Sequence, residues 1–125
     1  MPLTTIADVR TIGINVANQD DAVDFYVTTL GFKKRLDAPI SPTMRWIEVA
    51  PPGATTSIAL QASDDVGDGG ADTGIRFTAP DAAAEHAAMQ ARGVIVGELL
   101  RWDGVPPMFS FEDPDGNRFY IVEES

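Results

Sequence analysis

The strongest constraint on this chain is a positional repeat between its two halves. A glycine closes an apolar helical pattern at Gly31 and again at Gly93, and a proline stands in a turn at Pro52 and again at Pro114. Both pairs are 62 positions apart. A fixed offset between equivalent helix ends and equivalent turns indicates two copies of one structural unit. The chain is therefore expected to fold as two similar modules.

The first half predicts one strand, one helix and three further strands. Residues 9–16 alternate apolar with polar side chains, the pattern of a strand with one buried face. Asn18 is suited to cap a helix, and an apolar stripe from Ala22 to Leu30 leads to Gly31, where the helix should end. Strand-like runs at 32–37, 44–50 and 56–62 complete the unit.

The second half repeats this order after a linker. Residues 63–72 are rich in aspartate and glycine and predict an exposed connection. A calcium-binding loop from Asp64 is an alternative, but its twelfth position is Ile75, where such loops need a glutamate. A strand at 73–79, a helix at 80–92 and strands near 94–100, 107–112 and 117–123 follow.

These patterns predict an α+β protein with one domain, residues 1–125. Module one covers about 8–62, the linker 63–72, and module two about 73–123. A chain of 125 residues with 44% hydrophobic content is large and apolar enough for a single core.

Composition narrows the expected setting and partners. No apolar run is long enough to span a membrane, no signal peptide is visible, and there is no cysteine, so we expect a cytoplasmic protein without disulfides. A formal net charge of −10 would repel phosphates, which argues against nucleic acid as a partner. The charge would attract cationic small molecules, although solubility is the commoner reason for it.

Four segments carry a family resemblance, namely DDAVDFYVTTLGF, RWIEVAPPG, ARGV and FEDPDGNRFYIVEE. In combination they resemble the vicinal oxygen chelate superfamily, which includes glyoxalase I, bleomycin-resistance proteins and extradiol dioxygenases. The resemblance implies two βαβββ modules that form a half-open curved sheet around a cavity. It also implies a homodimer, in which a second subunit often completes that cavity.

Metal-using members of that superfamily hold their ion with histidine and glutamate side chains on four strands. In this chain the matching positions are Thr11, Ala59, Gly74 and Tyr120. None of them supplies the His, Asp or Glu side chain that a divalent catalytic site requires, so we expect no metal and no cofactor. The single histidine, His86, shares a helical stripe with Ala82 and Met89, which favours packing against the sheet.

The strand faces opposite the apolar core offer a mixed lining that suits a small-molecule pocket. The candidate ligand-binding residues are Asn15, Trp46, Glu48, Arg76, Trp102, Met108 and Tyr120. Trp46 and Tyr120 are nearly as well suited to packing at a dimer interface. Arg76 and Glu48 are slightly better suited to a structural ion pair with each other than to anchoring a ligand. Trp102 lies in a predicted loop, where it is equally suited to be part of a lid over the cavity or an ordinary surface residue.

Two classes of function compete. We favour a metal-independent binding protein, similar to the bleomycin-resistance branch, that holds a drug or metabolite near a dimer interface. The alternative is an enzyme of the same superfamily, a lyase, isomerase or dioxygenase, with non-standard metal ligands or with Glu48 as a metal-free general base whose pKa burial would raise. A third option is an interaction module with a collapsed cavity.

Overall fold

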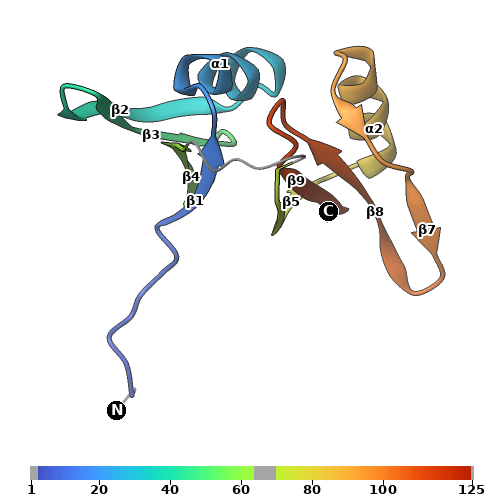
Figure 1. Ribbon diagram of the computed structural model, residues 1–125. Coiled ribbons are helices and arrows are strands. Elements are labelled where there is room, and N and C mark those ends of the chain that lie inside the picture. The colour runs from blue at the N-terminus through green and yellow to red at the C-terminus, as the bar shows by residue number, and fades with distance from the viewer. Residues whose placement is uncertain (1–2, 64–69, 125) are drawn as a thin grey trace.

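The computed structural model describes residues 3–63 and 70–124, and their strands form two sheets (Figure 1). The elements are, in chain order, β1 (Thr11–Val16), α1 (Gln19–Val23), η1 (Asp24–Thr29), β2 (Lys33–Ser41), β3 (Met44–Ala50), β4 (Ser57–Ala62), β5 (Asp72–Ala79), α2 (Ala82–Ala91), β6 (Ile95–Val96), β7 (Leu100–Trp102), β8 (Val105–Glu112) and β9 (Arg118–Glu123).

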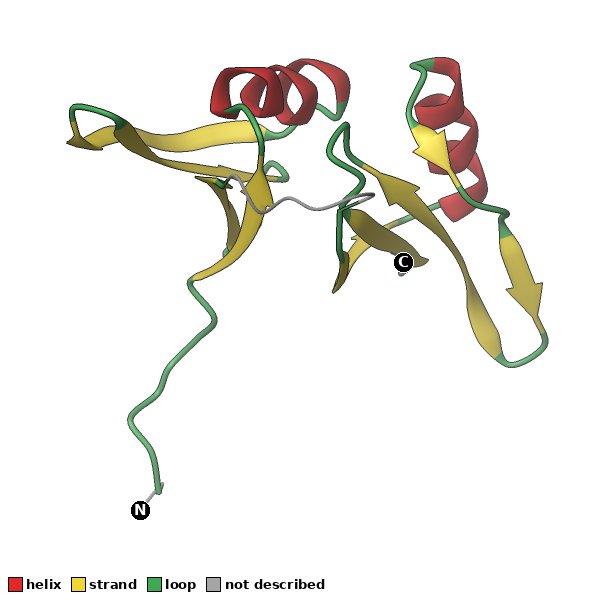
Figure 2. Ribbon diagram, in the orientation of Figure 1, coloured by secondary structure: helices red, strands yellow, loops and turns green. Residues whose placement is uncertain are grey.

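The two sheets have the same plan. The first follows the order β1-β4-β3-β2, and the second follows β5-β9-β8-β6 with β7 also paired to β8. In each sheet the first strand of the module runs parallel to the last, β1 to β4 and β5 to β9, and the other ladders are antiparallel. The helices of each module lie over its own sheet (Figure 2). The predicted α+β class and paired βαβββ plan are confirmed, with the curvature divided between two sheets.

The first helix differs from the prediction in its second half. Asn18 caps α1 as expected, since its side-chain oxygen accepts a bond from the Asp21 amide at 2.9 Å. From Asp24 onward the helix widens into the π-helical η1, where the Leu30 amide reaches the Phe25 carbonyl at 2.9 Å. An apolar stripe predicts a helix, but it does not distinguish α-helical from π-helical hydrogen bonding.

Three strand predictions need correction. The run 94–100 is two strands, β6 and β7, because the pairing with β8 shifts by one residue between Val96 opposite Phe111 and Leu100 opposite Met108. The predicted loop around Trp102 is wrong, since β7 and β8 form a hairpin there. The strand predicted at 32–37 continues to Ser41 and includes Pro39, which is tolerated because β2 is an edge strand.

Part of the predicted linker lies outside the described residues. These are positions 64–69, so the start of the alternative calcium loop at Asp64 lies outside them too. The described ends of the segment are anchored, because the Ser63 amide donates to the Val16 carbonyl at 3.0 Å and Asp72 already begins β5. None of the described helices is both long and apolar enough to cross a bilayer.

The two modules share one apolar core. Tyr26 and Phe32 of module one contact Phe119 and Phe77 of module two, with ring centroids 6.1 Å and 5.4 Å apart. Tyr26 and Phe119 are fully buried. Burial of this aromatic area stabilises the contact between the modules.

A buried carboxylate adds a polar connection at the same place. Asp113 is 2% exposed and accepts bonds from the Tyr26 hydroxyl at 2.7 Å and the Asn117 side chain at 2.9 Å. The amides of Asp115 and Asn117 complete its shell at 2.9 Å, and Asn117 also donates to the Asn15 carbonyl of module one. Burial, and then the Asp113 charge, raise the pKa of the Tyr26 hydroxyl. The modules are therefore joined by hydrogen bonds as well as by packing.

Candidate functional site

Six of the seven candidate residues lie on strand faces that point away from the helices, which we call the open faces. Side chains alternate along a strand, and the neighbours of Trp46 and Glu48, such as Ile47 and Val49, are fully buried in the core. The same alternation places the others, which are Asn15, Arg76, Met108 and Tyr120. Trp102 lies on the outer hairpin opposite Val105 and is 58% exposed.

The first sheet carries a tight polar group that we call the module-one cluster, made of Arg10, Trp46, Glu48 and Ser57. The carboxylate of Glu48 accepts bonds from the Trp46 indole at 2.7 Å and the Ser57 hydroxyl at 2.6 Å. Glu48 is 6% exposed, and an Arg10 guanidinium nitrogen lies 3.9 Å away. The bond from Ser57, followed by that from Trp46, lowers the pKa of Glu48.

This geometry corrects two expectations about Glu48. Burial was expected to raise its pKa, but bonds to the ionised form lower it instead, and both carboxylate oxygens are already occupied. Glu48 is therefore a poor general base. The expected pair with Arg76 is also wrong, because the cation near Glu48 is Arg10.

The second sheet carries a module-two cluster of Asp72, Arg76 and Tyr120. The Tyr120 hydroxyl donates to Asp72 at 2.7 Å, which raises the pKa of Tyr120 and lowers that of Asp72. Arg76 lies opposite Tyr120 in the ladder, with its guanidinium carbon 5.1 Å from the ring centroid. Met108 lies on the neighbouring strand β8, where it pairs with Leu100 of β7 and Val122 of β9.

Three members of these clusters were missed by the sequence reasoning about the site. Asp72 shares the alternation of Gly74 and Arg76, so a predicted strand starting one residue earlier would have included it. Ser57 shares the alternation of Ala59 and Gln61, but its bond to Glu48 depends on how β4 lies beside β3. Arg10 carries no such signal, because its contact depends on the path of the chain before β1. Among the described residues, no hydrogen bond, ion pair or ring contact joins the two clusters.

The four positions that hold metal in relatives of this kind do not fit a metal here. The Thr11 hydroxyl donates to the Ser57 carbonyl at 3.1 Å, and the Tyr120 hydroxyl is bonded to Asp72. Ala59 and Gly74 have no donor side chain. Within 3–63 and 70–124, no three His, Cys, Asp or Glu side chains gather as ligands would. His86 packs instead, with its Nε2 at 2.8 Å from the Gly97 carbonyl and its ring edge-on to Phe109.

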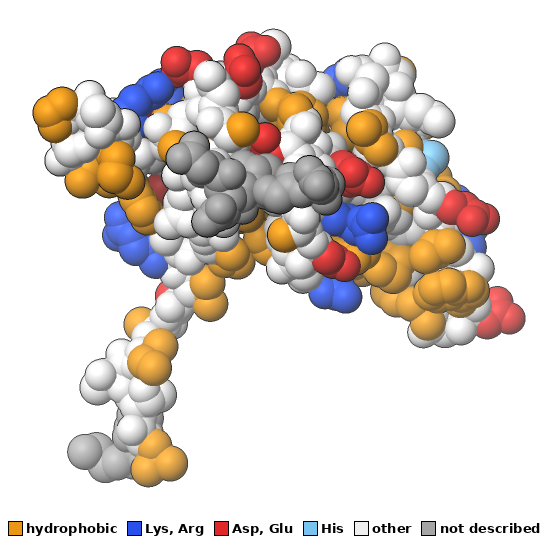
Figure 3. All heavy atoms as spheres, in the orientation of Figure 1, with side chains coloured by type: hydrophobic (Ala, Val, Ile, Leu, Met, Phe, Trp, Pro, Cys, Tyr) orange, Lys and Arg blue, Asp and Glu red, His pale blue; other side chains and the backbone are white. Residues whose placement is uncertain are grey.

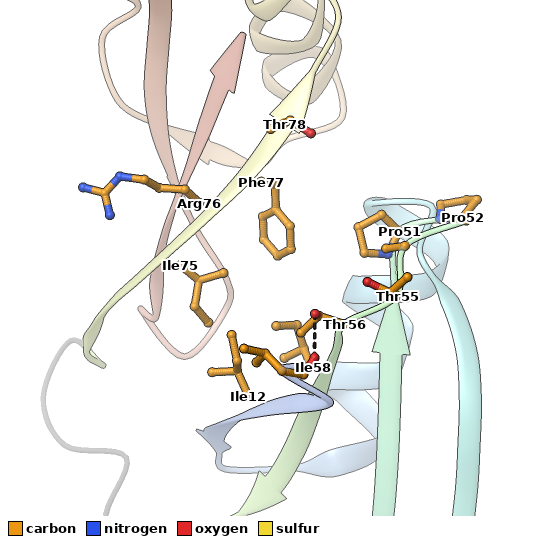
Figure 4. A pocket seen from close by; sticks show the side chains of 13 residues that line it. Ile12, Pro51, Pro52, Thr55, Thr56, Ile58, Ile75, Arg76, Phe77 and Thr78 are labelled. Atoms are coloured by element: carbon orange, nitrogen blue, oxygen red, sulfur yellow. Dashed lines mark hydrogen bonds between the residues drawn. The ribbon is translucent and has the colours of Figure 1, made fainter. Parts of the chain in front are cut away.

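A separate cavity lies at the seam between the modules and has a volume of about 690 Å³. We call it the seam groove; its walls include Val9, Ile12, Pro51, Ile58, Ile75 and Phe77. Figure 4 shows Ile12, Ile58, Ile75 and Phe77 turned toward the groove, whereas Arg76 points away from it. Apart from Arg76, the polar side chains that line the groove are the threonines Thr55, Thr56 and Thr78, and no Trp, Tyr, Asp or Glu is among the lining residues.

The shifted pKa of Glu48 predicts a pH dependence of stability. The pKa of Glu48 is lower in the folded state, so as the pH falls the unfolded chain takes up a proton before the folded protein does. The ionised carboxylate therefore stabilises the fold fully above the unfolded-state pKa, and this stabilisation is lost as the pH falls through the folded-state pKa. Urea unfolding of Glu48→Gln should therefore show a shallower loss of stability between about pH 5 and pH 3 than the unchanged protein. Replacing the exposed Glu98 by Gln is the matched control. Parallel curves for wild type and Glu48→Gln would contradict the assignment.

The fold and its open faces place the protein among the two-module βαβββ proteins. The chain belongs to the Glyoxalase/Bleomycin resistance protein/Dioxygenase superfamily, whose family profile matches residues 8–121. It is 30% identical over 122 residues to YetH of Bacillus subtilis (strain 168), covering 94% of this chain and 99% of that protein.

Two solved structures are close in both sequence and shape. A member of the same superfamily from Sphaerobacter thermophilus DSM 20745 is 38% identical, with a TM-score of 0.87 over 97% of this chain and 100% of that one. TnmS3, an antibiotic-binding protein from Streptomyces sp. CB03234, is 33% identical, with a TM-score of 0.85 over 98% of this chain and 99% of that one.

Proposed function

We propose that this protein binds a small organic molecule on its open faces without using a metal, as a homodimer whose second subunit completes the pocket. The observation that carries the proposal is the likeness to an antibiotic-binding protein, at 33% identity over 98% of this chain. A drug or a related metabolite is therefore the class of ligand we favour.

The side chains of the open faces support this proposal. Trp46, Met108 and Tyr120 provide apolar and aromatic area, which contributes most of the binding energy in small-molecule sites. Arg76 is held by a bond to the Gly74 carbonyl, so it would present a fixed charge for orienting a ligand, and the buried Glu48 fixes the position of the Trp46 indole. The negative net charge of the chain would speed the approach of a cationic ligand.

One feature of the surface supports a second subunit. Exposed apolar side chains gather on both outer hairpins, with Leu36, Ile40 and Met44 on β2–β3 and Trp102 and Val105 on β7–β8. Figure 3 shows hydrophobic side chains collected over the β7–β8 hairpin at one end of the molecule. Apolar patches of this kind commonly mark interfaces, and a partner covering them would also enclose the open faces.

The two tryptophans give a direct test, since Trp46 and Trp102 are the only two in the chain and both are candidate residues. Titration with a panel of neutral and cationic antibiotics should change tryptophan fluorescence for at least one compound. Trp46→Ala should weaken the affinity for that compound by about 10–100-fold, as loss of a buried aromatic contact does. Binding should be unchanged after dialysis against EDTA.

Trp46→Phe is the matched control, because it keeps an aromatic ring and removes only the bond from the indole to Glu48. We expect it to retain most of the affinity. The proposal is rejected if no compound binds, or if Trp46→Ala binds as tightly as the unchanged protein. A requirement for added metal would reject the metal-independent part alone.

A further inference from the structure

Strand β5 is irregular next to the module-two cluster. From Asp72 to Arg76, β5 advances four residues. Over the same part of the ladder β9 advances only two, from Arg118 to Tyr120, so β5 bulges by two residues. Bulges re-aim side chains and are common beside binding sites. Local bonding fixes this one, because the Asp72 side chain accepts from the Gly74 amide at 3.1 Å. The position of Arg76 is therefore set by a break in the ladder.

The Arg76 guanidinium is held from two sides. Its Nη1 donates to the Gly74 carbonyl at 2.9 Å, and its central carbon lies 5.1 Å from the Tyr120 ring centroid. Tyr120 is itself fixed, because its hydroxyl donates to Asp72 at 2.7 Å. A long side chain that is restrained in this way loses less conformational entropy on binding than a free one does. Arg76 is therefore partly preorganised for a ligand.

Most of the hydrogen-bonding capacity of Arg76 is left over. A guanidinium has five N–H donors, and the Gly74 carbonyl takes one of them. Within residues 3–63 and 70–124, no carboxylate oxygen lies at ion-pair distance from Arg76. Both oxygens of the nearby Asp72 already accept bonds, from the Tyr120 hydroxyl and the Gly74 amide. The module-two cluster therefore presents a positive charge with donors to spare.

There is room for a ligand group at these donors. The Arg76 side chain points away from the seam groove, as Figure 4 shows, and lies against Tyr120 on the open face. A Cβ added to Gly74, whose carbonyl holds the guanidinium, would meet nothing within 4 Å. Arg76 is also exposed. An incoming group can therefore approach the guanidinium from solvent.

The chemistry of these donors selects an acidic oxygen group. A planar guanidinium pairs best with a carboxylate, whose two oxygens can accept two parallel N–H bonds. The chain as a whole carries a net charge of −10, which disfavours an anion at long range. At physiological salt that repulsion is screened beyond about 8 Å, so the charge at the point of contact decides which group binds. Met108 and Tyr120, on the same open face, suit the apolar remainder of such a ligand.

We propose that Arg76 is a specificity-determining residue of the open faces, and that it anchors a carboxylate or a similarly acidic oxygen group on an aromatic ligand. This inference rests on the proposed function, since it names the chemical class of the ligand for the same site. It concerns one group of the ligand, so the molecule as a whole can be anionic, neutral or cationic.

Two probes of similar size and shape test the anchor, 2-naphthoate and the uncharged 2-naphthamide, each titrated into the protein by isothermal titration calorimetry. We expect the dissociation constant of 2-naphthoate to be lower by at least about tenfold. Arg76→Gln should reduce that preference to less than about twofold by weakening 2-naphthoate and leaving 2-naphthamide nearly unchanged. Arg76→Lys keeps the charge without the planar fork, so it should retain about a threefold preference.

Arg101→Gln is the matched control, because it makes the same change of charge at an exposed arginine of β7. It should leave the preference within about twofold of that of the unchanged protein. The inference alone fails if both probes bind equally, if the preference survives Arg76→Gln, or if neither probe binds while a compound of the antibiotic panel does. If no compound of either set binds, the proposed function fails with it.

Discussion

Replacing Asp113 by alanine should lower the free energy of unfolding by about 3–5 kcal/mol, because it removes the acceptor from several buried donors at once. The donors are the Tyr26 hydroxyl, the Asn117 side chain and the amides of Asp115 and Asn117. Asp113 is 2% exposed, so water does not readily replace the missing carboxylate. Urea unfolding followed by far-UV circular dichroism measures the effect.

Tyr26→Phe is the control for Asp113→Ala. It removes one donor and leaves the carboxylate with three, so its expected cost is about 1–2 kcal/mol. If Asp113→Ala were no more destabilising than Tyr26→Phe, the carboxylate would not be the centre of the network.

Replacing Gly70 by alanine should cost about 3 kcal/mol or more of stability, for two reasons that act together. Gly70 has a positive φ of 68°, where a side chain is strained. A Cβ there would also lie 2.3 Å from the carbonyl carbon of Gly116 and 2.6 Å from the Asn117 amide nitrogen. These are backbone atoms of the turn before β9, so relief requires the turn to move away from the end of the linker.

Gly104→Ala separates the two reasons. Gly104 has a φ of 79°, but a Cβ there would meet nothing within 4 Å. Its expected cost is that of backbone strain alone, about 1 kcal/mol. Equal melting temperatures for the two variants would show that the close contact between Gly70 and the turn does not contribute to the loss of stability.

Much of the fold could be predicted from the sequence because the signals were local. Gly31 and Gly93 end their helices with φ angles of 84° and 83°, as their repeated placement indicates. The alternation in β1, β3, β5 and β9 separates core from open face correctly. The split between β6 and β7 was missed because it depends on a one-residue shift in how the two strands pair with β8, which local sequence patterns do not show.

The candidate site was less predictable, because the state of a polar side chain depends on partners from other strands. The apolar residues on either side of Glu48 in the sequence predict a buried acid with a raised pKa. Hydrogen bonds from Ser57 of β4 and Trp46 of its own strand lower that pKa instead. Gly13 of β1 has no side chain, but the space beside it is filled, since a Cβ there would lie 2.7 Å from the Gln61 side-chain oxygen. The seam groove gave no sequence signal, because its walls come from both modules.

The shared aromatic core and the hydrogen bonds of Asp113 join the two sheets through one packed, hydrogen-bonded region. The angle between the open faces is therefore settled when the chain folds, and little ordering entropy is left for the moment of recognition. A ligand would therefore bind to a preorganised surface. Adaptation to a new ligand can then proceed by exchanging single side chains on exposed strand positions, while the hidden joint that sets the shape stays unchanged.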